Sequence, residues 1–152
     1  MKKFLTFLLS FCILFNLFIT PAVAETSSSA STEKQYYKFI ADDTGNIYPI
    51  LISEQEFQKA VGIRSPHYAE GWIVTSISGN TVAYISLHYQ TVTSAGKQVF
   101  DLSTAYLEVN PQNGYAGHID FLNKSAHSII IQYTYSNILE NGYRTHTFYP
   151  QQ

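Results

Sequence analysis

Residues 129–136 read Ile-Ile-Ile-Gln-Tyr-Thr-Tyr-Ser, and from position 129 every second side chain is large and apolar. Residues 83–90, Ala-Tyr-Ile-Ser-Leu-His-Tyr-Gln, repeat this alternation. Side chains of a β-strand point to opposite faces in turn, so each stretch predicts a strand with one face covered by protein and the other in water. Strands of this kind indicate an all-β fold.

The gaps between the expected strands are short and carry Gly, Asn or Pro, which tight reversals favour. Such gaps cannot hold a crossover helix, so neighbouring strands are expected to pair antiparallel. Pro49 has no N–H for a sheet and predicts an edge strand. The fold expected is a small antiparallel sandwich or a partly open barrel of about seven or eight strands. These strands cover residues 34–41, 47–52, 71–78, 81–93, 98–110, 115–122, 126–138 and 143–149.

One short helix is expected at residues 53–61. Ser53 and Glu56 have the spacing of a capping box, in which each side chain satisfies a backbone N–H at the helix start. Phe57 can pack against the isoleucine before the cap as a hydrophobic staple. Gly62 predicts the end of the helix.

The first 24 residues have the three-part layout of a secretory signal. Met1 to Lys3 is positively charged, residues 4–19 form an apolar run, and Ala22-Val23-Ala24 places small residues where a signal peptidase cuts. The run is shorter than the roughly 20 residues of a permanent anchor, and Cys12 lies inside it, unlike a lipoprotein cysteine. We therefore expect cleavage after Ala24 and secretion, in the manner of a Gram-positive-type bacterium.

After cleavage, residues 25–33 are expected to be a flexible Ser/Thr-rich linker, because they carry no large apolar side chain. Residues 34–152 are expected to form a single β-rich domain. Cys12 is the only cysteine, so the mature chain cannot use disulfides, thiolate metal sites or thiol catalysis.

The charge of the chain disfavours some partners. The formal charge is −2, and it becomes −4 once Lys2 and Lys3 are removed with the signal. Nucleic acids and anionic membranes reward clustered basic residues, which this chain lacks. We therefore expect no nucleic acid, no membrane after cleavage, and no cofactor.

The chain holds 12 tyrosines, a residue type favoured in binding surfaces. Tyr36, Tyr37, Tyr68 and Trp72 are the candidate binding residues, for an unknown protein or a cell-wall glycan. Because Tyr36 and Tyr37 are adjacent on one strand, at least one is expected to face solvent or an edge. The other interpretation is that the aromatic residues simply fill a β-sheet core.

Residues 62–71 form the longest irregular stretch and carry Arg64, His67 and Glu70. Loops on rigid scaffolds often hold catalytic groups. These residues, together with Asp120, are the candidates for an extracellular hydrolase. No Gly-x-Ser-x-Gly motif is present, and the spacing of the carboxylates selects no acid–base pair.

His118 and Asp120 lie two positions apart on one expected strand, so they share a face and could be two ligands of a metal site. The sequence identifies no third ligand. The function predicted is binding without catalysis. The alternatives are the hydrolase near residues 62–71, or a secreted inhibitor or toxin-system component with a protruding loop at Ser65-Pro66 or Pro111-Gln112.

Overall fold

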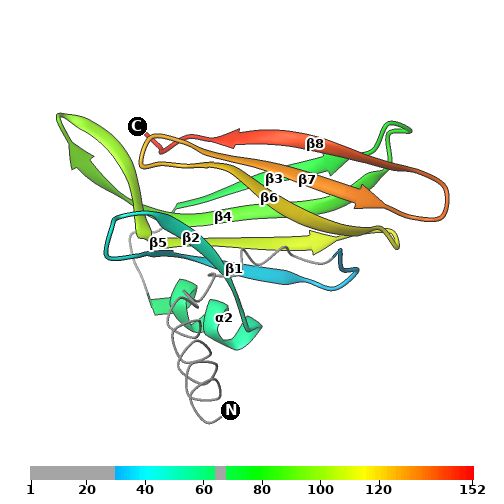
Figure 1. Cartoon of the computed structure of the whole chain (residues 1–152), viewed down its shortest axis with the longest axis horizontal. Coiled ribbons are helices and arrows are strands. Elements are labelled where there is room, and N and C mark those ends of the chain that lie inside the picture. Colours follow the sequence, from blue (N-terminus) through cyan, green and yellow to red (C-terminus); the bar gives the residue numbers. More distant parts are fainter. Residues whose placement is uncertain (1–29, 64–67) are drawn as a thin grey trace, which may run out of the picture.

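The computed structural model describes residues 30–63 and 68–152. Within these residues, eight strands form two antiparallel sheets that pack face to face, and a single helix lies outside them (Figure 1). The all-β prediction is confirmed, with no closed barrel. The elements are β1 (Gln35–Ala41), β2 (Ile47–Ile52), α2 (Glu54–Ile63), β3 (Tyr68–Thr75), β4 (Thr81–Ser94), β5 (Lys97–Pro111), β6 (Ala116–Lys124), β7 (Ile129–Ser136) and β8 (Asn141–Phe148).

The larger sheet has the strand order β2-β1-β5-β4-β3, and the smaller sheet has the order β6-β7-β8. Pro49 lies on an edge strand, as predicted. The prediction that neighbouring strands pair is wrong for β5 and β6, which belong to different sheets. Asn113 and Gly114 between them both have positive φ, 53° and 74°. This tight turn carries the chain onto the facing sheet, so that two apolar faces cover each other.

The core lies between the sheets, and its side chains follow the predicted alternation. Strand β4 contributes Ile85, Leu87 and Tyr89, and β7 contributes Ile131 and Tyr133. Full burial of an aliphatic side chain of this size stabilises the fold by about 2 kcal/mol. The other core residues are Tyr37, Phe39, Val74, Val82, Ala83, Phe100, Ala105, Leu107, Val109, Tyr115, Ile119, Ile129, Tyr135 and Phe148.

Helix α2 packs on the outer face of the larger sheet. Phe57 joins Tyr36 and Tyr106 in a second, smaller apolar cluster. Ser53 Oγ accepts a hydrogen bond from the Glu56 N–H at 3.2 Å, so the predicted cap forms. The apolar face of the helix therefore covers part of the sheet that alternation alone leaves exposed.

The end of the helix and the start of β3 differ from the prediction. The helix continues through Gly62 to Ile63, because a glycine costs only about 1 kcal/mol relative to alanine inside a helix. Strand β3 begins at Tyr68, where the ladder with β4 starts. The irregular stretch predicted at 62–71 is thus divided between the helix, the strand and residues 64–67, which lie outside the described residues.

No helix in the described parts of the chain has the length and apolar character needed to cross a membrane.

Candidate functional site

Three of the predicted site residues lie on one side of β3. Tyr68, Glu70 and Trp72 are two positions apart, so their side chains share the face that points towards the smaller sheet. Glu70 and Trp72 meet His146 on β8, the edge strand of that sheet. We name the group formed by these four residues and Phe148 the β3–β8 seam.

Aromatic rings of β3 and β8 contact one another in the seam. The indole of Trp72 and the imidazole of His146 have centroids 4.9 Å apart and planes 11° apart. The Phe148 ring meets the same imidazole edge-on, at 4.6 Å and 79°. The sequence does not single out His146, because it has no motif spacing with another histidine. His146 lies opposite Trp72 only because the two sheets pack face to face, and the sequence does not show this packing.

Glu70 and His146 form an acid–base pair whose charges burial disfavours. Glu70 Oε1 lies 4.0 Å from His146 Nε2, which is too long for a hydrogen bond. Burial raises the pKa of Glu70 and lowers the pKa of His146, because a partly desolvated site favours the neutral form of each. Among the described residues, His146 Nε2 has no hydrogen-bond partner. The serines of the described part of the chain therefore form no serine–histidine pair of the kind that a hydrolase uses through this nitrogen.

Tyrosines extend the seam towards the C-terminal residues. The rings of Tyr68 and Tyr89 stack at 5.6 Å and 27°. The Tyr89 hydroxyl donates to the Tyr149 carbonyl at 3.5 Å and accepts from the Gln151 N–H at 3.3 Å. Tyr68 and Tyr149 are exposed, so the molecule offers aromatic surface at Tyr68 of the seam and at Tyr149 beside it. Trp72, by contrast, has one face covered by the stacked imidazole.

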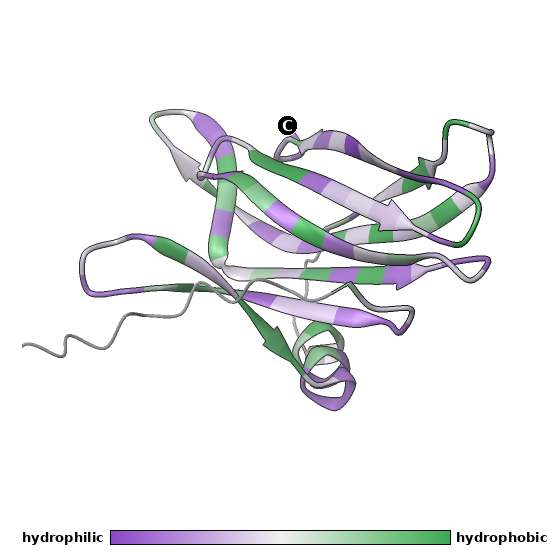
Figure 2. Ribbon diagram, turned by 45° about the vertical axis from the view of Figure 1, so that its right-hand side comes forward, coloured by the Kyte–Doolittle hydropathy of each residue, from purple (hydrophilic) through white to green (hydrophobic). Residues whose placement is uncertain are grey.

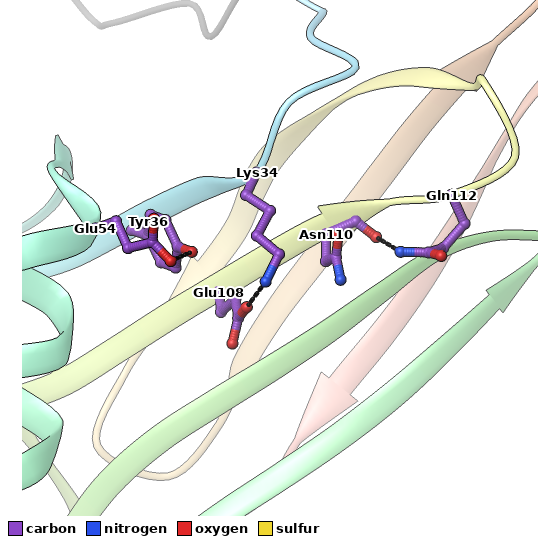
Figure 3. Close-up of polar contacts among 6 residues, drawn as sticks. All are labelled: Lys34, Tyr36, Glu54, Glu108, Asn110 and Gln112. Atoms are coloured by element: carbon purple, nitrogen blue, oxygen red, sulfur yellow. Dashed lines mark hydrogen bonds and ion pairs between the residues drawn. The ribbon is translucent and has the colours of Figure 1, made fainter.

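The prediction that Tyr36 or Tyr37 faces solvent or an edge is wrong, because they are only 4% and 5% exposed and β1 lies between β2 and β5. Helix α2 covers Tyr36, whose hydroxyl donates to Glu54 at 3.0 Å (Figure 3). Burial, together with this hydrogen bond, raises the pKa of Tyr36 to about 12. Tyr37 lies in the core between the sheets. Both rings are packing groups, because the helix and the smaller sheet cover the two sides of β1.

The His118–Asp120 pair lies on the outer face of the smaller sheet, with Nε2 and Oδ2 3.4 Å apart. No group of three or more His, Cys, Asp or Glu residues that could hold a metal ion is found within the described residues. Asp120 does not meet Glu70, since β6 and β3 lie at opposite edges of the sandwich. Arg64 and His67, the other hydrolase candidates, lie outside the described residues.

Three aliphatic side chains project into solvent at one end of the sandwich. Ile138 and Leu139 on the β7–β8 turn are 99% and 86% exposed, and Ile77 on the β3–β4 turn is 76% exposed. Figure 2 shows the two turns at the same end of the molecule, and a 2.7 Å hydrogen bond from Ser78 to Glu140 joins them. Single exposed apolar residues are ordinary, whereas several of them on two joined turns make a candidate interaction surface. We name these three residues the apolar end.

A hydrogen-bond network fixes the two turns. Asn137 Oδ1 accepts from the N–H groups of Leu139 and Glu140, each at 2.8 Å. The Glu140 carboxylate accepts from the hydroxyls of Tyr115 and Ser78. These hydrogen bonds, that of Tyr115 first, lower the pKa of Glu140 to about 2. Hydrogen bonds within the chain therefore fix the conformation of the turn.

The sequence prediction does not identify the apolar end. It assigns Ile138 to a strand, whereas β7 ends at Ser136. Of the predicted protruding loops, Ser65-Pro66 lies outside the described residues, and Pro111-Gln112 is half-buried, with the Gln112 N–H bonded to the Val82 carbonyl at 2.9 Å. The available signal is a turn-forming asparagine followed directly by two large aliphatic residues.

The chain matches no protein-family model, no curated protein and no solved structure with which it was compared. Its function must be inferred from the seam and the apolar end.

Proposed function

We propose that this chain is an exported, non-catalytic binding protein that docks on a partner protein through the apolar end. The observation that carries this proposal is the near-complete exposure of Ile77, Ile138 and Leu139 on turns that hydrogen bonds hold fixed. Export is supported by the secretory pattern of residues 1–24.

The energetics favour a protein pocket as the complementary surface. Burial of each exposed aliphatic side chain in an apolar pocket stabilises a complex by about 2 kcal/mol. A turn that is already ordered loses little conformational entropy on binding. A glycan, whose surface is rich in hydroxyl groups, would remove these side chains from water less effectively.

The two alternative functions, a secreted inhibitor and a hydrolase, are supported to different degrees by the apolar end and the seam. A secreted inhibitor is a special case of the proposal, in which the pocket belongs to an enzyme. A hydrolase has less support, because within residues 30–63 and 68–152 no nucleophile contacts the Nε2 atom of His146 beside Glu70.

The test compares the purified protein with the double variant Ile138→Ser/Leu139→Ser. A partner recovered from spent culture or cell-wall fractions is purified, and its affinity is measured by calorimetry. We expect the double variant to bind about 1,000-fold more weakly, which corresponds to the loss of two buried aliphatic contacts of about 2 kcal/mol each.

Ile73→Ser is the matched control. Ile73 is also an exposed isoleucine, but it lies on β3 and outside the apolar end, so its replacement should leave the affinity unchanged. Equal affinity of the wild type and the double variant would refute this surface as the binding site. Recovery of a glycan in place of a protein would contradict the partner class.

A further inference from the structure

The outer face of the smaller sheet presents its side chains to solvent. On β7 the inward side chains belong to the core, whereas Gln132 and Thr134 point outward and are half-buried by their neighbours. On β8 the outward ring of Tyr143 is 62% exposed. Ser31 bridges the opposite edge of this sheet, at β6. The outward side chains of β7 and β8 are therefore accessible to a ligand.

The strand register sets the outward side chains in two rows that cross the three strands. Neighbours within a row lie on adjacent strands, about 4.8 Å apart, and the two rows are about 7 Å apart along the strands. Each row thus presents one polar or aromatic side chain per strand at a regular spacing. The rows are Tyr143, Thr134 and His118, and then Thr145, Gln132 and Asp120.

Most of the polar groups in these rows are not used inside the protein. The side chains of Gln132, Thr134 and Thr145 form no hydrogen bond with the residues at 30–63 and 68–152. His118 and Asp120 at the β6 end of the rows pair with each other, with Nε2 and Oδ2 3.4 Å apart. One amide and two hydroxyl groups therefore remain for a ligand beside the tyrosine ring.

The outer face of the larger sheet has a different chemistry. Tyr84 is 45% exposed there, but its cross-strand partner on β3 is Ile73, an apolar residue that is 60% exposed. Lys34 and Glu108 on the same face form an ion pair at 3.3 Å (Figure 3). An exposed tyrosine thus has an aliphatic neighbour on this face, whereas on the smaller sheet its neighbours carry hydroxyl and amide groups.

Charge complementarity on this face favours a neutral ligand. None of the outward positions of β6, β7 and β8 holds Lys or Arg, so the face offers no strong cation to an anionic ligand. The carboxylate of Asp120 would repel such a ligand. A sugar fits the remaining groups, because its hydroxyls can bond to the amide and hydroxyl side chains while its C–H face packs on the Tyr143 ring.

We propose that the outer face of the smaller sheet binds a neutral β-1,4-linked polysaccharide that lies across β8, β7 and β6. Such a chain is extended and flat, and each sugar ring advances it by roughly the 4.8 Å between neighbouring strands. One ring packs on Tyr143, and the hydroxyls of the following rings bond to Thr134 and Gln132. This site is separate from the apolar end and does not depend on the function proposed for it.

The test is titration of the purified protein with cellohexaose and, separately, with the β-1,4-linked hexamer of N-acetylglucosamine, followed by NMR. We expect at least one of them to bind with a Kd below about 1 mM and to shift the side-chain amide signals of Gln132. Tyr143→Ala should weaken this binding at least about 10-fold, because the packing surface is lost. Tyr143→Phe keeps the ring and should weaken it less than about 3-fold. No binding of either hexamer would overturn the proposal.

Tyr84→Ala is the matched control, because it removes an exposed tyrosine from the outer face of the other sheet and should leave binding unchanged. Ile138→Ser/Leu139→Ser should also leave it unchanged, which separates this proposal from the previous one. Two further sugars test the ligand class: maltohexaose, whose α-1,4 linkages curve the chain, and the β-1,4-linked hexamer of mannuronate, which carries a carboxylate on each ring. Both should bind at least about 10-fold more weakly. Equal binding of either sugar, or an unchanged affinity of Tyr143→Ala, would overturn the proposal.

Discussion

The two edge strands of the smaller sheet, β6 and β8, are covered by different kinds of contact. Strand β8 is closed by side chains, since Trp72 of the facing sheet stacks on His146. On β6, the described residues form a single backbone bridge at this edge, between Ser31 and Gly117. Closure with rings removes water from the polar groups beside them, and the pKa values of Glu70 and His146 shift accordingly.

Each edge strand also carries a glycine against a tyrosine of β7, and substitution there should have the largest effect. A Cβ on Gly117 would lie 2.1 Å from Tyr133 Oη, whereas one on Gly142 would lie 2.8 Å from Tyr135 Oη. Both rings are buried in the core and cannot move without disturbing it. We expect Gly117→Ala to lower the free energy of unfolding by about 3 kcal/mol and Gly142→Ala by about 1 kcal/mol, measured with urea.

Gly71→Ala is the control for these variants, because a Cβ there meets no atom within 4 Å. Its free energy of unfolding should stay the same or rise slightly, since alanine restricts the unfolded chain. In a Tyr133→Ala background, the cost of Gly117→Ala should fall below about 1 kcal/mol. An unchanged cost would show that contact with the ring is not the cause.

The second largest loss of stability is expected when the Trp72 ring, which stacks on His146 at the β8 edge, is removed. Trp72→Ala removes a half-buried ring from the seam, and we expect a loss of about 2 kcal/mol in the free energy of unfolding. Ile73→Ala, on the exposed face of the same strand, should change it by no more than about 0.5 kcal/mol. Equal losses in the two variants would mean that stacking on His146 does not hold this edge.

Features that depend on local sequence could be predicted, whereas features that depend on how the two sheets pack could not. The strands were predictable because alternation is local: residues 129–136 show it without knowledge of any neighbour. The cap at Ser53 was predictable for the same reason. The separation of β5 from β6 was not, since a short turn can close a hairpin or cross between sheets, and only packing decides which.

The candidate site was predictable in part. Glu70 and Trp72 stood out by residue type, but His146 meets them only through the packing of two sheets. The burial of Tyr36 depends on a helix that folds back over its strand. Ile138 was not predicted as an exposed residue, because the sequence alone does not distinguish a buried from an exposed apolar residue at the end of a strand.

Replacement of Glu70 tests how burial of a carboxylate in the β3–β8 seam changes the stability of the fold with pH. Burial raises the pKa of Glu70 in the fold, so its contribution to stability is greatest below pH 4.5 and declines as the pH rises through the folded value. Glu70→Gln removes this decline. We expect the variant to be more stable than the wild type at pH 7, by less than about 1 kcal/mol because water screens a partly exposed group, and equally stable near pH 3. Urea unfolding at both pH values checks this, and a less stable variant at pH 7 would mean that the carboxylate has a stabilising partner.

The smallest effect concerns His146 itself, and it decides whether burial or the nearby carboxylate controls the seam. Burial lowers the pKa of His146 below its ordinary 6.5, so the neutral ring stabilises the fold above that pH and the stability is lost as the pH falls below it. If desolvation is the cause, Trp72→Ala should let water reach the ring and return its pKa towards 6.5, whereas Glu70→Gln should leave it below 6.5. NMR titration of the imidazole measures all three proteins. A wild-type value above 6.5 that drops in Glu70→Gln would instead show that ion pairing outweighs burial, and the two edges would then differ by charge and not by exclusion of water.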